Sequence, residues 1–262
     1  MIDLKIIIAA ILKSGEFEVS KWIYKRNNNS NCKCRLFCLP YAGAGASIYA
    51  KWAEYVDDDI EVIPIQLPGR ENRRNESLCN DAEIVVSHIA DAMADLLDKP
   101  FAMFGYSMGG ILAYELTLKI YEKYKKRPEK LFMSASSVFR DKKPVEVSQM
   151  DEEQLVHYMK KSDGMPETIL KDDRYRKEYF PVIKNDYSLI ERYKFNYNKV
   201  PCDIVAFASK EDKEVGYQNV RLLRFFTKKF NMYHMLGNHF FIRNNYEDLG
   251  EIVSKELMDV TK

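Results

Sequence analysis

The sequence lacks a marked excess of charge of either sign, and it lacks an apolar run long enough to cross a membrane. Its 262 residues contain 40 Lys and Arg against 39 Asp and Glu, so no strongly basic field points to nucleic acid. The apolar run at residues 6–12 is far shorter than the ~20 residues of a membrane span, and no small-residue cleavage site follows it. We therefore expect a soluble, cytoplasmic protein that binds neither nucleic acid nor membrane.

Cysteine is scarce and unevenly spaced, which limits the chemistry that it supplies. The chain has 5 cysteines, and the pair Cys32 and Cys34 has neither a second pair nor suitably spaced histidines. This spacing is not that of a zinc site, and an odd number of thiols is typical of a reducing compartment. The metal motif His-Glu-x-x-His does not occur either. We expect the protein to need no metal and no redox cofactor.

Short apolar segments alternate with helical patterns over residues 35–262. Such alternation predicts a single α/β domain in which a mostly parallel sheet is flanked by helices. Residues 1–34 precede it as an N-terminal extension of unassigned role, with a helix expected over 3–12 and a short strand over 19–24. The expected strands are 36–39, 60–65, 101–104, 130–135, 204–208 and 231–236, and the expected helices are 48–55, 82–97, 111–124, 219–227 and 247–258.

The alternation breaks between about residues 138 and 200, where helical patterns replace the strands. Ser148 and Asp151 have the spacing of a helix-start box. A helical insertion of this length inside a regular α/β chain is typical of a lid over an active site, although it would also serve to enlarge the core. An apolar stripe on its second helix comprises Phe180, Ile183, Tyr187, Ile190 and Tyr193.

The strongest chemical signal is the pentapeptide Gly-Tyr-Ser-Met-Gly at residues 105–109. It follows the expected strand 101–104 and precedes the expected helix 111–124. A Gly-x-Ser-x-Gly sequence in a strand–turn–helix setting is the nucleophile elbow of serine hydrolases. The turn is tight enough to strain the serine backbone, and glycine stands two residues away on each side because bulk does not fit there. We predict Ser107 as the nucleophile.

A serine hydroxyl needs a base to remove its proton, and the base needs a carboxylate to orient it. In hydrolases of this architecture the chain order is serine, acid, histidine. Among the 4 histidines, His239 follows the last expected strand at the carboxyl edge of the sheet, whereas His234 lies within that strand. Asp212 lies a few residues after the preceding strand, with Glu211 and Glu214 as rivals. We predict His239 as the base and Asp212 as the orienting acid.

Two backbone N–H groups should complete the site by stabilising the negative charge that develops on the substrate. Met108, directly after the nucleophile, supplies one of them. We expect the other in the small-residue loop at 39–46, where we choose Ala42. The glycines of this loop match neither the dinucleotide fingerprint nor the Lys-bearing P-loop, which argues against a phosphate site.

With these residues assigned, the chain resembles the type II thioesterases of non-ribosomal peptide and polyketide synthesis, and also the medium-chain acyl thioesterases of fatty acid synthesis. The resemblance implies an α/β-hydrolase fold and the removal of wrong or stalled acyl groups from the phosphopantetheine arm of a carrier protein. Acyl or peptidyl carrier domains of a synthase are then the partners, and phosphopantetheine is part of the substrate rather than a cofactor. The matching segments are 36–43, 63–71, 104–110 and 237–241.

The chain departs from the family pattern in three places. Tyr106 stands where the family usually has histidine before the nucleophile, and Gly237 with Asn238 replaces the usual Gly-Gly before the catalytic histidine. The N-terminal extension is not a usual family feature. None of these departures removes a triad member, so they bear on the shape of the pocket rather than on activity.

We also expect four residues near these motifs to bind substrate or carrier. Arg70 would contact the pantetheine phosphate or an acidic carrier surface, with Arg73 and Arg74 beside it. The alternative for Arg70 is a structural salt bridge or a solvated surface charge. The other expected binding residues are Tyr41, Tyr106 and Phe240.

Three other functions remain open on the sequence. One is release of medium-chain fatty acyl groups, and another is carboxylesterase, lipase or acyltransferase activity with the same triad. The third is a non-catalytic module that recruits a carrier protein, and the intact Ser107, Asp212 and His239 argue against it. We expect the protein to be a monomer.

Overall fold

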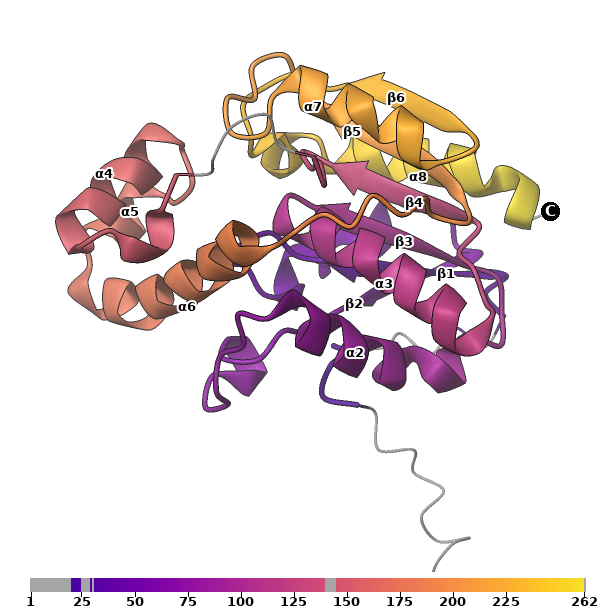
Figure 1. Ribbon diagram of the computed structural model, residues 1–262, viewed down its shortest axis with the longest axis horizontal. Helices are drawn as coiled ribbons and strands as arrows, with labels where there is room; N and C mark the ends of the chain where they lie inside the picture. The colour runs from indigo at the N-terminus through magenta and orange to yellow at the C-terminus, as the bar shows by residue number, and fades with distance from the viewer. Residues whose placement is uncertain (1–19, 25–28, 30, 140–144, 262) are drawn as a thin grey trace, which may run out of the picture.

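The computed structural model describes residues 20–24, 29, 31–139 and 145–261. A six-stranded sheet runs through the middle of the molecule in the order β2-β1-β3-β4-β5-β6, and all of its strands are parallel (Figure 1). The predicted α/β class, a parallel sheet flanked by helices, is confirmed. The strands are β1 (Cys34–Leu39), β2 (Ile60–Pro64), β3 (Phe101–Tyr106), β4 (Lys130–Ser134), β5 (Asp203–Ala208) and β6 (Phe230–His234).

The register aligns the C-terminal ends of the strands at one edge of the sheet. Leu39 at the end of β1 pairs with Gly105 of β3, and Ala208 at the end of β5 pairs with His234 of β6. Because the strands are parallel, the loops that follow β1, β3, β5 and β6 all start from this edge. Those loops contain the predicted triad, Ser107, Asp212 and His239, and the predicted oxyanion donor Ala42.

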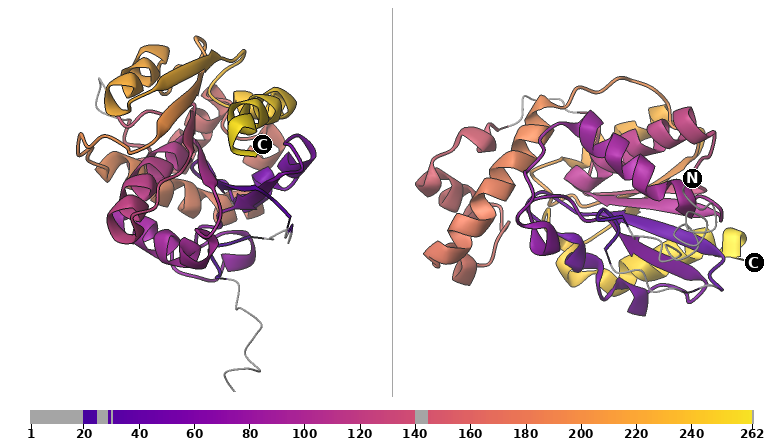
Figure 2. Two further views of the ribbon diagram at one scale, coloured as in Figure 1. Left: turned by 90° about the vertical axis from the view of Figure 1, so that its right-hand side faces the viewer. Right: turned by 90° about the horizontal axis from the view of Figure 1, so that it is seen from below.

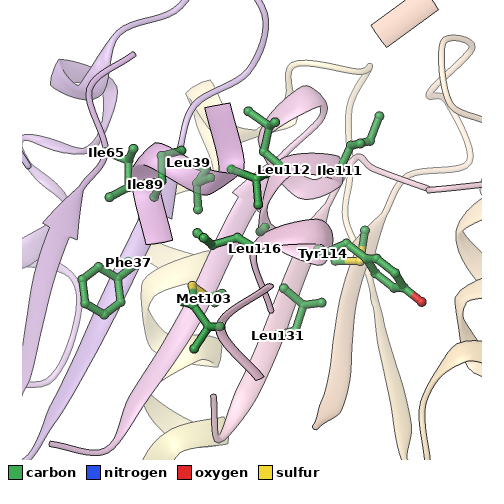
Figure 3. Close-up of a cluster of buried hydrophobic side chains, with 14 of the residues drawn as sticks. Phe37, Leu39, Ile65, Ile89, Met103, Ile111, Leu112, Tyr114, Leu116 and Leu131 are labelled. Atoms are coloured by element: carbon green, nitrogen blue, oxygen red, sulfur yellow. The ribbon is translucent and has the colours of Figure 1, made fainter. Parts of the chain in front are cut away.

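One face of the sheet is covered by α2 (Ala82–Met93), α3 (Met108–Tyr124) and α7 (Tyr217–Arg221). Leu116 of α3 and Met103 of β3 are both fully buried in the cluster that fills this layer (Figure 3). Full burial of an aliphatic side chain stabilises the fold by ~1.5–3 kcal/mol, so this layer is a main source of stability.

The opposite face carries α8 (Tyr246–Thr261) and two 3₁₀ turns, η1 (Ala46–Tyr49) and η2 (Trp52–Glu54). Trp52 packs edge-on against Phe104 of β3, with 4.4 Å between the ring centroids. With both faces covered, strands β1 to β5 are buried almost throughout, which explains their largely apolar sequences, whereas the edge strand β6 has no fully buried residue.

Three segments that we predicted as single helices contain 3₁₀ turns. The helix predicted over 82–97 is α-helical only to Met93 and ends in a 3₁₀ turn. Residues 48–55 span the end of η1, a two-residue link and η2. Tyr49 and Trp52 are both buried and lie three residues apart, which is the 3₁₀ period. Residues 219–227 contain the end of α7 and then η6 (Leu222–Phe226). The remaining 3₁₀ turns outside the insertion are η3 (Glu71–Arg73), η4 (Ala94–Leu96) and η7 (Phe241–Asn244).

In the described residues between β4 and β5 the chain forms three helices, called here the insertion helices. They are α4 (Glu152–Lys161), α5 (Glu167–Leu170) and α6 (Asp173–Arg192), and the turn η5 (Val147–Gln149) precedes them. They lie beyond the C-terminal edge of the sheet (Figures 1 and 2). They share a small apolar core of their own, made of Val147, Leu155, Met159, Leu170, Phe180 and Ile183.

The start of α4 lies one turn later than the predicted helix-start box. Asp151 is its N-cap: the Asp151 carboxylate accepts the Gln154 N–H, and the Gln154 side chain accepts the Asp151 N–H. Ser148 lies in η5 instead, where its N–H donates to the carboxylate of Glu191 on α6 at 3.0 Å. This contact holds η5 against α6.

Of the N-terminal extension, the structure describes residues 20–24, 29 and 31–34. Ile23 forms a single antiparallel bridge with Ile65, in place of the strand that we predicted over 19–24. The predicted helix over 3–12 lies outside the described residues.

Candidate active site

Ser107 occupies the turn between β3 and α3 in a backbone conformation that L-residues rarely adopt, with φ 51° and ψ −115°. A Cβ at Gly105 would lie 2.2 Å from the carbonyl oxygen of Gly109, and a Cβ at Gly109 would lie 2.1 Å from that of Leu39. Only glycine therefore fits at both positions. Strain of this kind costs ~1–3 kcal/mol and is typical of functional sites, and here it raises the Ser107 side chain above the edge of the sheet.

The imidazole of His239 lies between Ser107 and Asp212. Its Nε2 is 2.9 Å from the Ser107 Oγ, and its Nδ1 is 2.9 Å from the Asp212 Oδ2. The carboxylate assigns the Nδ1 proton, so Nε2 is left to accept the hydrogen bond from the serine hydroxyl. Both distances are those of ordinary hydrogen bonds, and no movement is needed to connect the three groups.

Asp212 is almost fully buried, yet its carboxylate is well supplied with donors. Its side chain is 3% exposed. Its Oδ1 accepts the backbone N–H groups of Glu214 at 2.9 Å and Val215 at 3.1 Å. Burial alone would raise the pKa of Asp212, but the hydrogen bond and charge of His239 and the two backbone donors outweigh it, and the pKa is lowered. The carboxylate is therefore ionised at neutral pH.

The other residues considered for the base and the orienting acid do not contact Ser107 or His239. His234 ends β6 with an exposed side chain that faces the Tyr217 ring, 6.0 Å between centroids. Glu211 is exposed, and the Glu214 carboxylate accepts the hydroxyl of Tyr158 from α4 at 2.6 Å. Of the alternatives weighed on the sequence, the structure brings only His239 and Asp212 to Ser107.

The loop after β1 forms a tight turn beside the nucleophile. The Ala44 N–H donates to the Tyr41 carbonyl at 3.0 Å, and Gly43 has φ +80°, as the third residue of a type II turn requires. The Ala42 N–H belongs to the same peptide unit as the Tyr41 carbonyl and therefore points away from the turn. The Met108 N–H is at the first position of α3, where no intrahelical acceptor exists. Both amides are thus available to a ligand.

Arg70 is not on the surface, and this corrects its expected role in binding the carrier or the pantetheine phosphate. Its side chain is 5% exposed and pairs with Asp186 of α6 through two hydrogen bonds of 2.6 and 2.8 Å. Arg73 is also buried, with its guanidinium 4.3 Å from the centroid of the Trp22 ring. Arg74 alone of the three is exposed, so they do not form one basic surface.

Tyr106 is fully buried, so the expected contact with substrate or carrier is also corrected. Its hydroxyl donates to the carbonyl of His239 at 2.6 Å and accepts the N–H of Ile242 at 3.3 Å. Burial raises the pKa of Tyr106 well above its usual value, so the phenol keeps its proton. Tyr106 therefore holds the backbone that carries the imidazole. The departure from the family's histidine was the sequence signal for a special role here.

Tyr41 and Phe240 lie beside the imidazole. Their rings meet edge-on at 5.4 Å between centroids, and the Phe240 ring is 5.1 Å from that of His239. Phe240 also faces Gly164 of the insertion, where a Cβ would lie 3.5 Å from its ring. Both aromatic rings border the triad at the junction with the insertion.

The loop that carries His239 is tied to the turn between α4 and α5. The side-chain amide of Asn238 donates to the Asp163 carboxylate at 3.0 Å. The guanidinium of Arg243 donates to the carbonyls of Asp163 at 2.8 Å and Gly164 at 2.7 Å. Sequence reasoning missed these contacts, because nothing in either segment indicates its partner.

The described residues offer neither a metal site nor a membrane-spanning helix. Across the described ranges, no three His, Cys, Asp or Glu side chains are grouped to hold a metal ion. Among the helices that the structure describes, none is both long and apolar enough to span a membrane.

A strained serine at a strand–helix turn, joined to a histidine and a buried aspartate at the edge of a parallel sheet, defines a serine hydrolase of the α/β-hydrolase fold. Comparisons with known proteins give the particular family. A family model described as "Thioesterase domain" matches residues 34–257. The chain belongs to this thioesterase family of hydrolases.

Individual relatives agree with this placement. The gramicidin S biosynthesis protein GrsT of Aneurinibacillus migulanus is 34% identical over 247 residues, which cover 92% of this chain and 95% of that protein. The medium-chain S-acyl fatty acid synthase thioesterase of Rattus norvegicus is 30% identical over 82% of this chain and 83% of its own length. The solved structure of the type II thioesterase BorB from the borrelidin biosynthetic cluster superposes with a TM-score of 0.81 at 27% identity, covering 90% and 97% of the two chains. The predicted likeness to type II thioesterases of peptide and polyketide synthesis is confirmed.

Proposed function

We propose that the protein hydrolyses acyl thioesters on the phosphopantetheine arm of carrier domains, and so frees a peptide or polyketide synthase from wrong or stalled acyl groups. The observation that carries this proposal is the His239 ring, which lies 2.9 Å from both Ser107 and Asp212 in a chain of the thioesterase family. Relatives in gramicidin S and borrelidin biosynthesis support the synthase setting.

The residues perform the reaction in two half-reactions. The Ser107 Oγ attacks the thioester carbonyl carbon and passes its proton to the Nε2 of His239. The oxyanion that forms accepts the N–H groups of Ala42 and Met108. When the tetrahedral intermediate collapses, the C–S bond breaks, and the thiol leaves with the proton from His239. Water then attacks the acyl-serine by the same route, releasing the acid and restoring Ser107.

The insertion helices act as the lid in this proposal. They carry a core of their own beyond the edge of the sheet, and they touch the loops of both Asp212 and His239. Tyr41 and Phe240 border the imidazole on the side of the insertion, so we assign them to the acyl chain. Arg70 and Tyr106 are left out of substrate binding because both are buried in contacts of their own.

Release of medium-chain fatty acyl groups is the second candidate. It is favoured by the rat medium-chain fatty acid synthase thioesterase, which matches over 82% of this chain. The two candidates share every catalytic residue and differ only in the acyl chain and carrier that the insertion admits.

A direct comparison of substrates tests the proposal. Purified protein is given short acyl and aminoacyl thioesters on a carrier domain, a medium-chain acyl carrier thioester, and the matching oxygen ester. We expect carrier thioesters to be hydrolysed faster than the oxygen ester. A preference for medium chains would select the second candidate, and a strong preference for the oxygen ester would overturn both. Labelling of Ser107 by a fluorophosphonate, absent in Ser107→Ala, excludes a non-catalytic carrier-binding module.

A further inference from the structure

We propose that Asp186, on α6 of the insertion, is a positioning residue for the oxyanion hole: it holds the turn that carries the Ala42 N–H. The inference rests on the function proposed above and extends it to a residue far from the triad in sequence. It links the insertion to the chemistry as well as to substrate access.

The Asp186 side chain is 2% exposed and is surrounded by donors. Its Oδ2 accepts the backbone N–H of Gly43 at 2.8 Å and the Arg70 Nη1 at 2.6 Å. Its Oδ1 accepts the Arg70 Nη2 at 2.8 Å and the side-chain amide of Asn185 at 3.3 Å. One carboxylate therefore binds the turn after β1 and the buried arginine at the same time.

The hydrogen bond from the Gly43 N–H to Asp186 fixes the central peptide unit of the turn, which the hydrogen bond within the turn does not hold. In a type II turn the hydrogen bond between the first and fourth residues does not involve the central peptide unit. Here the central peptide unit joins Ala42 to Gly43. Its N–H is the one that Asp186 accepts. Rotation of this unit would tilt the adjoining peptide unit, whose N–H is that of Ala42. Asp186 therefore controls the direction of the proposed oxyanion donor.

Helix α6 also packs an apolar side chain against the turn. A Cβ at Gly43 would lie 2.7 Å from the Cγ1 of Ile183, which lies one helical turn before Asp186. The two side chains share a helix face, so α6 contacts Gly43 through both a hydrogen bond and close packing. Such close approach explains why glycine stands at this position in addition to its positive φ.

Arg70 and Gln66 hold the same turn from the side of the sheet. The Arg70 Nη1 also donates to the carbonyl of Ala44 at 3.2 Å. The Gln66 side chain accepts the Ala46 N–H at 2.7 Å and donates to the Arg70 carbonyl at 2.9 Å. The loop after β1 is thus held between the segment after β2 and the insertion. The oxyanion hole is complete only when α6 rests on the core.

Two sets of variants test this inference. Asp186→Leu combined with Arg70→Leu removes both charges, so no unpaired charge is left buried, but the Gly43 N–H loses its acceptor. Loss of one oxyanion donor costs ~10²–10³ in rate, so we expect kcat to fall ~10²-fold with KM changed less than about threefold. Asp186→Asn, likewise combined with Arg70→Leu so that no charge is left unpaired, keeps an oxygen for the Gly43 N–H and should lose much less. Glu191→Gln is the matched control, because this α6 carboxylate accepts the N–H of Ser148 within the insertion; it should match the wild-type kcat.

A transition-state analogue separates positioning from mere stabilisation. A trifluoromethyl ketone that mimics the acyl thioester adds to Ser107 and places an oxyanion in the hole. We expect its affinity to weaken in the double variant by the same factor as kcat/KM, with active sites counted by complete fluorophosphonate labelling. If the double variant only melts at a lower temperature, while kcat per labelled site and analogue affinity stay at wild-type values, the inference is wrong. If the wild-type protein neither hydrolyses thioesters nor labels at Ser107, the proposed function fails first and the inference with it.

Discussion

The triad and the insertion helices are held in place by different means. Ser107, Asp212 and His239 lie in the segments that follow the ends of parallel strands, and contacts with the backbone hold them. The glycines on either side of Ser107 have no room for a Cβ, and the Asp212 carboxylate accepts two backbone N–H groups. The insertion has its own small core and meets the loops of Asp212 and His239 through side-chain hydrogen bonds. Its helix α6 is joined to the rest of the domain by the Arg70–Asp186 ion pair and by Leu189 and Ile190, which are buried in the main core. The strands and their loops thus fix the positions of the three side chains, whereas the insertion, in the roles proposed above, controls access and the direction of the Ala42 N–H.

The largest effect should come from the nucleophile itself. In Ser107→Ala, kcat for a carrier-bound thioester should fall at least ~10⁴-fold, because triad members act as a unit. Binding of the acyl-carrier substrate should persist, since the insertion and its contacts remain. Stopped-flow hydrolysis and a binding titration check both expectations. Residual turnover close to the wild-type value would exclude Ser107 as the nucleophile.

Asp212→Asn comes next, with an expected loss in kcat of ~10³–10⁴-fold, because the amide favours the wrong imidazole tautomer. Glu214 is close in sequence, but its carboxylate is bound by the Tyr158 hydroxyl of α4, so we do not expect it to replace Asp212. Steady-state kinetics of Asp212→Asn alone and combined with Glu214→Gln measure this. A loss below tenfold in the single variant that deepens in the double variant would show that Glu214 does replace it.

A smaller effect, confined to substrate binding, should follow from loosening the insertion. Arg243→Leu removes the two hydrogen bonds to the turn between α4 and α5, and we expect KM to rise several-fold with kcat within about threefold of wild type. Arg243 lies over the Phe240 ring at 4.4 Å, and Arg224 lies over the Phe225 ring at 4.8 Å, so Arg224→Leu is the matched control. Equal effects of the two substitutions on KM would contradict a specific role of the insertion contact.

The smallest effect on turnover is expected at the opposite end of the sheet. Arg35 of β1 is buried and contacts Glu61 of β2 at 3.1 Å, Asp98, and the Leu96 carbonyl at 2.7 Å. Arg35→Leu leaves Glu61 without this cation, and breaking a buried pair in this way costs ~3–5 kcal/mol. Urea unfolding should show that loss, while kcat per folded molecule stays unchanged. A drop in kcat comparable to that of the Arg70 and Asp186 variant would remove the distinction between the two buried pairs.

Much of the fold and the triad was accessible from the sequence because local pattern determines them. Strands buried on both faces read as apolar runs, and the tight turn at 105–109 requires glycines at fixed spacing. Chain order then selected Asp212 and His239 from few alternatives. The broken helix at 48–55 was missed because its buried residues also fit a helical period over so short a segment.

The partners of Arg70 and Tyr106 were not accessible in the same way, although a structural salt bridge was one of the readings of Arg70. Neither a charged side chain in a loop nor a phenol at the end of a strand carries a mark of its partner, and Asp186 lies 116 residues from Arg70. The tyrosine pairs with a backbone carbonyl 133 residues away. Whether such groups face solvent or core depends on how distant loops meet, which hydrophobic period does not encode.

The close backbone contact beneath the nucleophile also bears on how such an enzyme changes over evolutionary time. At Gly105 and Gly109 the Cβ of any other residue would clash with backbone atoms, which cannot move aside as a flexible side chain can. The exposed side chains of α4, α5 and α6 face no such barrier. Substitutions should therefore be tolerated on the exposed surface of the insertion far more readily than at Gly105 and Gly109.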